Sequence, residues 1–176
     1  MIIETKRLFL RQLKKSDFDG LCKILQDTDV MYAYEGPFSD KEVQDWLYKQ
    51  LMRYKTDGFG LNAVILKETG EMIGQCGLTM QDFKDQKLLE IGYLFQKKYW
   101  HNGYATEAAI ACKEYAFTTL GAKKICSIIR DTNKSSQNVA LRNGMTPKDT
   151  FTKYYRGVEM PHILFSIERK SLNFER

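Results

Sequence analysis

Apolar residues recur with a period of two, or in short continuous runs bounded by turn residues, along several parts of the chain. Both patterns are typical of β-strands. The segment 88–95 is the clearest case, because its two alternating faces are almost wholly apolar. These patterns predict about seven strands, at residues 7–11, 61–66, 72–80, 88–95, 124–130, 148–156 and 160–169.

Apolar residues three and four positions apart, together with capping residues, predict about four helices, at roughly 17–26, 40–55, 103–120 and 134–143. Ser16 is the expected N-cap of the first helix, and Ser39 or Asp40 that of the second. Small and apolar residues share one face of the third helix, and Gly121 is expected to end it. That face comprises Ala105, Ala108, Ala109, Cys112, Ala116 and Leu120.

The order of elements is strands, then a βαβα run, then a final hairpin, which indicates an α/β (α+β) fold with a mixed sheet. The strand–helix–strand unit between residues 88 and 130 is expected to be parallel and right-handed. A chain of 176 residues with 43% hydrophobic content can form one sizeable core. We therefore expect a single domain over residues 1–176.

The turn after the strand at 88–95 has the features of an anion site. A loop containing Gly103 leads directly into the alanine-rich helix, so free backbone N–H groups and the positive end of the helix dipole converge there. Such sites bind phosphate groups. Two other glycine patterns do not fit: no G-x-x-x-x-G-K-[ST] occurs, and residues 58–63 lead into a strand rather than a helix.

The loop at residues 99–108, YWHNGYATEA, resembles the pyrophosphate loop of the GNAT (GCN5-related N-acetyltransferase) superfamily. Within it, the loop is most similar to the RimJ/RimL-like branch of ribosomal-protein N-terminal acetyltransferases. Three other blocks resemble that family in the same order and extend the similarity over most of the chain. They are TKRLFLR at 5–11 followed by Asp17, MIGQCGL at 72–78, and NKSSQNVALRNGM at 133–145.

The resemblance implies a GNAT-like acyl-CoA N-acyltransferase fold with acetyl-CoA as co-substrate and no metal. The cofactor is expected where the fourth and fifth strands diverge, with His101 contributing its backbone N–H, and Asn133 either receiving the pantetheine arm or only capping a helix. Lys97, Lys98, Lys134 and Arg142 are candidates for the 3′-phosphate of the cofactor, or else solvated surface charges. The expected cofactor-binding residues are Leu94, Phe95, His101, Asn102, Gly103, Tyr104, Ala105, Thr106 and Asn133.

Acetyl transfer to an amine needs a base for the amine proton and help for the departing thiolate. Glu90 is the candidate base, because the resemblance implies an acidic residue near this strand position; the alternative is a structural carboxylate with a partner. Many family members use a tyrosine acid on the helix after the fifth strand, but residues 138–143 contain none. Ser136, which matches the serine of N-x-x-S, is the second catalytic candidate, or a residue that only starts the helix.

The acceptor is the least determined part of the prediction. Direct attack by a primary amine in a ternary complex is expected, with a peptide or protein N-terminal α-amine ahead of a small-molecule amine such as a polyamine, amino acid or antibiotic. An α-amine, with a pKa of about 8, is far more often neutral at pH 7 than a lysine, with a pKa of about 10.4. A non-catalytic acyl-CoA sensor is the competing class. Aromatic and apolar residues between 28 and 60 suit either a pocket or a core: Met31, Tyr32, Tyr34, Phe38, Trp46 and Tyr54.

The net charge of +5 is modest and interspersed, so a nucleic-acid surface is not indicated. The four cysteines and two histidines lack metal-ligand spacing, and reduced core thiols are expected. No apolar run reaches the roughly 20 residues that a membrane-spanning helix needs, nor is a signal peptide evident. We expect a cytoplasmic protein, monomeric or homodimeric, that binds neither membranes nor nucleic acid.

Overall fold

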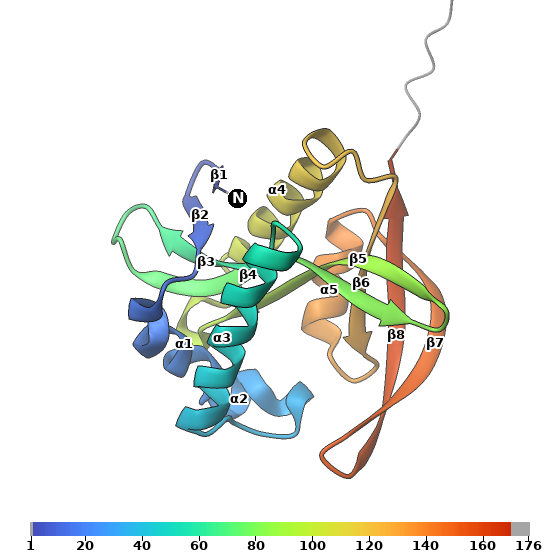
Figure 1. Ribbon diagram of the computed structural model, residues 1–176, viewed down its shortest axis with the longest axis horizontal. Coiled ribbons are helices and arrows are strands. Elements are labelled where there is room, and N and C mark those ends of the chain that lie inside the picture. Colours follow the sequence, from blue (N-terminus) through green and yellow to red (C-terminus); the bar gives the residue numbers. More distant parts are fainter. Residues whose placement is uncertain (1, 170–176) are drawn as a thin grey trace, which may run out of the picture.

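The computed structural model describes residues 2–169 and forms an eight-stranded mixed sheet in the order β1-β2-β3-β4-β5-β6-β8-β7 (Figure 1). Residue 1 and residues 170–176 of the expected domain lie outside the described residues. All neighbouring strands are antiparallel except β5 and β6, which are parallel as predicted. The strands are β1 Ile3–Glu4, β2 Leu8–Gln12, β3 Leu61–Leu66, β4 Met72–Phe83, β5 Gln86–Phe95, β6 Lys124–Arg130, β7 Thr146–Tyr155 and β8 Val158–Glu168.

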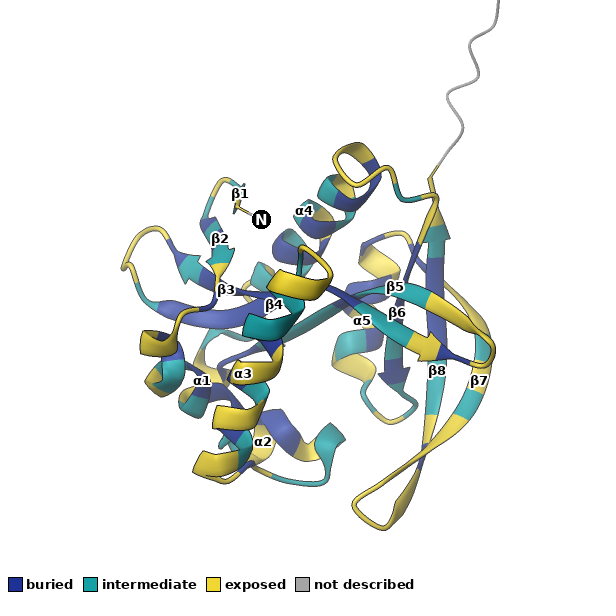
Figure 2. Cartoon of the chain, in the orientation of Figure 1, coloured by how far each residue is buried: buried dark blue, intermediate teal, exposed yellow. Residues whose placement is uncertain are grey.

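Helices cover both faces of the sheet. One apolar cluster joins α1, α2 and α3 to one face, and another joins α4 and α5 to the opposite face. Figure 2 shows exposed residues along the outer side of α3 and at the tip of the β7–β8 hairpin, whereas much of the central sheet is buried. The α-helices are α1 Phe18–Leu25, α2 Thr28–Met31, α3 Asp40–Thr56, α4 Tyr104–Thr118 and α5 Lys134–Arg142, with 3₁₀ turns at Lys15–Asp17, Tyr32–Tyr34 and Lys97–Tyr99.

The small residues of α4 let this helix pack closely on the sheet. Ala108, Ala109, Cys112 and Ala116 are fully buried against strands β2 to β6. Leu120, which was expected on the same face, is 39% exposed, so that part of the prediction was wrong. The helix ends at Thr118, before Gly121 takes a positive φ of 67°, and Leu120 therefore leaves the buried face.

The two sheet halves part between β5 and β6. A single pair, Glu90 with Cys126, is in register between these strands, while β4 and β5 pair over ten positions. Beyond that pair the strand ends separate toward α2, α5 and the loop that precedes α4. The divergence opens space at the centre of the fold, where the candidate site lies.

The predicted strands and longer helices are present with small shifts of their ends. Ser39 caps α3 in a capping box with Glu42, as one of the two expected alternatives. The short elements β1 and α2 were not predicted. No helix among residues 2–169 combines the length and apolar character required to cross a bilayer.

The start of α1 depends on Asp17 rather than on the predicted cap Ser16. The Asp17 carboxylate accepts hydrogen bonds from the Lys14 backbone N–H (2.7 Å) and from both terminal nitrogens of Arg11 (2.7 and 2.9 Å). A 3₁₀ turn occupies residues 15–17, so the α-helix begins at Phe18, one residue later than a Ser16 cap would place it. Burial alone would raise the pKa of Asp17, but the bonds from Arg11 and Lys14 outweigh it and hold that pKa below its usual value.

Replacing Asp17 by Asn should lower the free energy of unfolding at pH 7 by ~1–3 kcal/mol, because charge-assisted hydrogen bonds are lost in a buried place. The folded-state pKa of Asp17 is depressed, so its stabilisation is complete above the unfolded-state pKa of about 3.9 and disappears as pH falls through the folded-state value. Urea unfolding over a pH series should show the two proteins converging in acid. Asp45→Asn is the control, since Asp45 forms only an exposed pair with Lys41. If both variants lost the same free energy of unfolding, the hydrogen bonds of Asp17 would not have the stabilising effect assigned to them.

Candidate active site

Two adjoining cavities lie where β5 and β6 diverge. The first has a volume of about 1250 Å³ and is bounded by the end of β5, the loop before α4, the first turns of α4, and α5. The second, of about 510 Å³, lies between α3, β5, β6 and the β7–β8 hairpin. The two cavities share four lining residues, Tyr93, Leu94, Asn133 and Ser136. A group held in the first cavity can therefore meet a group held in the second.

The loop between β5 and α4 points free donors into the first cavity. His101 and Gly103 have positive φ angles of 61° and 79°, and Gly103 is the N-cap of α4. Within residues 2–169, the backbone N–H groups of residues 101–106 donate to no protein acceptor, and the first helical bond runs from Glu107 to Gly103. This is the donor arrangement that binds a phosphate or pyrophosphate.

Side chains within the loop fix its shape. Trp100 donates its indole N–H to the Phe95 carbonyl at 2.9 Å, which ties the loop to the end of β5. The Asn102 amide donates to the carbonyls of Tyr99 (3.3 Å) and Trp100 (2.9 Å). The loop is thus set in its conformation by the protein alone.

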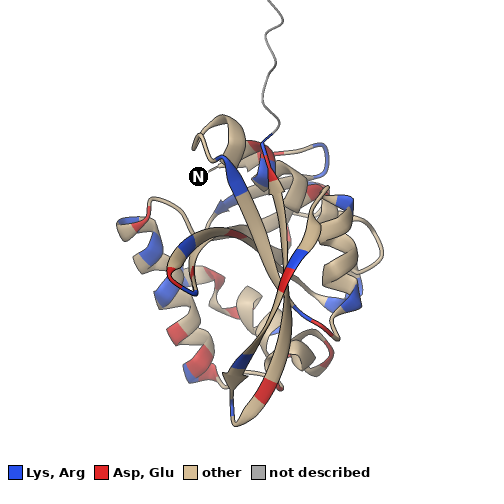
Figure 3. Cartoon of the chain, turned by 90° about the vertical axis from the view of Figure 1, so that its right-hand side faces the viewer, with Lys and Arg blue, Asp and Glu red and all other residues tan. Residues whose placement is uncertain are grey.

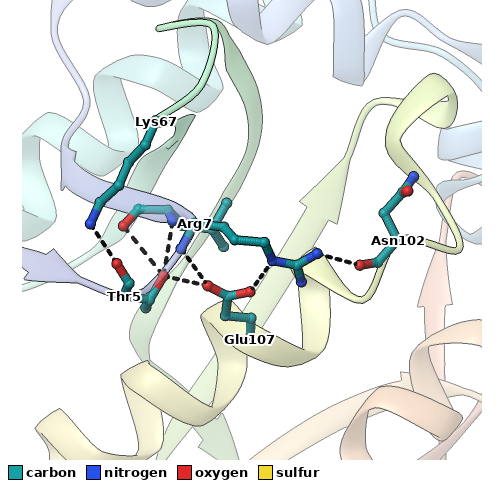
Figure 4. A network of polar contacts seen from close by, with 6 residues as sticks. Thr5, Arg7, Lys67, Asn102 and Glu107 are labelled. Atoms are coloured by element: carbon teal, nitrogen blue, oxygen red, sulfur yellow. Dashed lines mark hydrogen bonds and ion pairs between the residues drawn. The ribbon is translucent and has the colours of Figure 1, made fainter.

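Residues near the N-terminus anchor the loop through hydrogen bonds to its last part and to the first turn of α4, as Figure 4 shows. Glu107, in the first turn of α4, accepts hydrogen bonds from the Thr5 hydroxyl (2.6 Å) and from the Arg7 backbone and Nε (3.0 and 2.7 Å). Arg7 also donates to the Asn102 carbonyl at 3.0 Å, and its guanidinium lies 4.4 Å from the Tyr104 ring centre. The N-terminal segment and the loop therefore form one unit.

The opposite wall of the first cavity is the start of α5. Asn133 caps the helix, because its Oδ1 accepts the Ser136 backbone N–H at 3.0 Å. The Tyr93 hydroxyl of β5 donates to the Ser136 carbonyl of α5 at 2.7 Å. The N–H and the carbonyl of Ser136 are both held in this way, and Ser136 lines both cavities.

Glu90 is partly buried and lines the second cavity. Its Oε1 accepts the Ile128 backbone N–H at 3.2 Å, and its Oε2 accepts the Thr79 hydroxyl at 3.3 Å. Burial raises the pKa of the Glu90 carboxyl, although the positive charge of Lys153 and these two hydrogen bonds act in the opposite direction. The result is a carboxylate that both bridges the diverging strands and faces an open space.

The aromatic segment between residues 28 and 60 divides between pocket and core. Tyr34, Phe38 and Trp46 contact one another edge-on and line the second cavity, while Tyr32 lines the first. Met31 is fully buried in the core. Tyr54 lines neither cavity; its hydroxyl bonds the backbones of Leu13 and Leu61.

The four expected phosphate cations differ in their surroundings. Lys97 pairs with Asp29 (2.6 Å) and Lys98 with Glu71 (2.8 Å). Lys134 donates to the Asp131 carbonyl at 2.9 Å. Arg142 lines the first cavity and forms no ion pair within residues 2–169. Arg142 is therefore the best placed of the four to meet an outlying phosphate.

A family model described as an acetyltransferase (GNAT) domain matches residues 7–146 of the chain. The chain is also 35% identical over 170 residues to the uncharacterized protein YkkB of Bacillus subtilis (strain 168), covering 96% of this chain and 95% of that protein. The chain belongs to the GNAT acetyltransferase family. It is an acetyl-CoA-dependent N-acetyltransferase, as the resemblance of its loop predicted.

Two further comparisons agree with this membership. The uncharacterized N-acetyltransferase p20 of Bacillus licheniformis is 32% identical over 144 residues, which cover 81% of this chain and 79% of that protein. The fold is similar to that of RimL, a ribosomal L7/L12 alpha-N-protein acetyltransferase solved in complex with coenzyme A. The TM-score is 0.80 over 96% of this chain and 98% of that one, at 16% identity.

The residues predicted from the sequence for the site lie around the two adjoining cavities. All nine expected cofactor-binding residues line the first cavity, and both catalytic candidates line the second. The unbonded N–H groups at the loop suit a pyrophosphate, so acetyl-CoA fits this donor set. No group of three or more potential metal-ligating side chains occurs within residues 2–169.

Sequence reasoning missed two sets of residues. The anchors Thr5, Arg7 and Glu107 belong to the motifs noted above, but their mutual contact cannot be inferred from a single sequence. Three cations that line the second cavity, Lys49 and Arg53 of α3 and Lys153 of β7, were also missed, and for the two on α3 the sequence held a signal. Their spacing from Trp46, three and seven positions on one helix, was the available signal.

Replacing Gly103 by Glu should abolish measurable acetyl-CoA binding in calorimetry, because a negative side chain at the start of α4 would compete with the pyrophosphate. Backbone strain also contributes, since Gly103 has a φ of 79°. Gly121→Glu is the matched control, because Gly121 has a φ of 67° at the other end of α4, away from the loop. Binding by the Gly103 variant with unchanged affinity would contradict the assignment of the loop.

Proposed function

We propose that this enzyme acetylates the α-amine of a peptide or protein N-terminus, with Glu90 as base and Ser136 near the departing sulfur. The observation that carries the proposal is the junction of the two cavities. Ser136 lines both, and Glu90 lies on the side of the second cavity. A thioester in the first cavity and an amine in the second would meet beside these two residues, which suits direct attack in a ternary complex.

The first cavity would hold acetyl-CoA, which supplies the activated acetyl group as a thioester. The backbone N–H groups of residues 101–106 would bind the pyrophosphate, and Leu94 and Phe95 would border the pantetheine arm. The Asn133 Oδ1 is already engaged in capping α5, so only its amide nitrogen remains to meet the arm. The protein's part here is to bind and orient.

Glu90 has the environment that a general base needs. Its raised pKa brings it closer to that of an α-amine, so the proton of the attacking amine can pass to Oε1 or Oε2 with less cost than to an ordinary carboxylate. The bonds from Ile128 and Thr79 hold the carboxylate in a fixed orientation. Preorganisation of this kind reduces the reorganisation that proton transfer requires.

Ser136 is the candidate for help to the leaving group. Its backbone is fixed by Asn133 and Tyr93, and the residue lines both cavities where they adjoin. The demand on it is modest, because a free thiol has a pKa of about 8.5 and its thiolate is a stable leaving group near neutral pH. A hydrogen bond from a serine hydroxyl is proportionate to that task.

An α-amine suits this site better than a lysine amine. Glu90 is the only carboxylate among the described residues that line the second cavity. An α-amine with a pKa of about 8 is about one-tenth neutral at pH 7, whereas a lysine amine near 10.4 is neutral roughly once in 2,500 molecules. The structurally similar RimL is an alpha-N-protein acetyltransferase by its own description, which supports the same choice.

Glu90→Gln and Ser136→Ala should each slow acetyl transfer by about 10²-fold or more, the usual scale of general acid–base help. Gln at position 90 can still accept the Ile128 N–H, so the fold should persist. Activity of the parent should rise with pH as Glu90 loses its proton, and this limb should vanish in Glu90→Gln. Circular dichroism checks folding, and release of thiol from acetyl-CoA reports the rate. Parent-like rates in both variants would refute these roles while leaving the family membership intact.

Two peptides of matched sequence test the acceptor: one with a free N-terminus and no lysine, the other with a blocked N-terminus and one lysine. The free α-amine should be acetylated about 10²-fold faster if reactivity follows the neutral fraction. Mass spectrometry locates the acetyl group. Faster modification of the lysine would overturn the α-amine assignment. If small amines were acetylated while neither peptide reacted, the acceptor would be a small molecule and the peptide proposal would be wrong.

A further inference from the structure

The second cavity carries an excess of positive charge. Lys49 and Arg53, one helical turn apart on α3, line it from one side, and Lys153 of β7 lines it from another. Glu90 supplies the one carboxylate among the described lining residues. The charge of the wall is therefore about +2 when all four groups are ionised.

These three cations differ from others close by. Arg130 is paired with Glu35, and Arg156 is paired with Glu42. Within residues 2–169, by contrast, Lys49, Arg53 and Lys153 take part in no ion pair; Arg53 makes only a long contact of 3.4 Å with the Gln50 amide oxygen. Over the face seen in Figure 3, positive and negative residues are otherwise interspersed. The unpaired cations all line the second cavity, Arg53 half-buried and Lys49 and Lys153 exposed.

Charges in a concave, partly desolvated wall act more strongly than the same charges on an open surface. Burial lowers the pKa values of Lys49 and Arg53, and their mutual repulsion lowers that of Lys49 further. An anion placed among them would offset both the cost of burying these charges and the repulsion between them. A polycationic acceptor would be repelled by the same wall.

We propose that the acceptor carries a carboxylate a few atoms from its reactive amine, and that Lys49, Arg53 and Lys153 select it. This inference rests on the proposed amine acetylation and adds the chemical class of its acceptor. The carboxylate can be the side chain of an acidic residue next to a peptide N-terminus, or the α-carboxylate of a free amino acid. Polyamines and other polycations are disfavoured.

The test compares C-terminally amidated peptides that differ only at the second residue, Ser-Glu-Ala, Ser-Gln-Ala and Ser-Lys-Ala, alongside serine and serinamide. We expect kcat/KM to fall by about tenfold from the acidic to the neutral peptide, and again to the basic one, at low salt. The differences should narrow as ionic strength rises. If serine exceeds serinamide while the peptides do not differ, the carboxylate recognised is that of a free amino acid.

Variants of the lining cations test whether they cause the preference for acidic acceptors. Arg53→Gln and Lys153→Gln should each reduce the ratio of acidic to neutral turnover, because a ratio within one variant cancels any loss of folded enzyme. The controls Lys55→Gln, on the same helix as Arg53, and Lys148→Gln, on the same strand as Lys153, change cations that do not line the cavity. Their ratios should match the parent.

Three outcomes separate the inference from the function on which it rests. Acceptors turned over at rates independent of their charge would overturn the carboxylate proposal and leave amine acetylation standing. A charge preference that survives Arg53→Gln and Lys153→Gln alike would overturn the role of these residues. No turnover of any acceptor would overturn the proposed function, and the inference with it.

Discussion

The separation of β5 from β6 is the constraint on which the site depends. Because these parallel strands share only the pair Glu90–Cys126, backbone groups beyond it need other partners. Side chains supply some of them: Glu90 accepts the Ile128 N–H, and the Ser127 hydroxyl of β6 donates to the Ile91 carbonyl. The Tyr93 hydroxyl also links β5 to α5 by donating to the Ser136 carbonyl. These contacts link the elements on the two sides of the gap, and both cavities lie where the two strands separate.

The proposed pyrophosphate loop, residues 99–106, depends on residues that are distant in sequence. Its own side chains set its local shape, but Glu107 ties the start of α4 to Thr5 and Arg7, about a hundred positions earlier. Arg7 then reaches forward to the loop carbonyl of Asn102. A loop that binds through backbone N–H groups gains affinity only if those groups are held in place beforehand, and this remote anchor provides that rigidity.

Local patterns predicted the parts of the structure that local physics determines. The alternation along 88–95 placed Ile91, Tyr93 and Phe95 on one face, where they pack with the α4 cluster, and Leu94 on the other. The Ser39 capping box was likewise visible in the sequence. The features that were predicted wrongly, or not predicted at all, depend on tertiary contacts. Arg11 hydrogen-bonds Asp17 at the start of α1. Residues of α3 and β7 that are more than ninety positions apart line the same second cavity.

The structural contacts of Glu90 are compatible with the catalytic role that we propose for it. The hydrogen bonds from Ile128 and Thr79 stabilise the ionised carboxylate, whereas burial favours the protonated one. A carboxylate under one influence alone would be either too weak a base or permanently protonated near neutral pH. A carboxylate balanced between these influences suits the proposed base, which has to accept a proton from an amine while still holding the Ile128 N–H. The contact that bridges the diverging strands therefore also tunes the pKa of the proposed base.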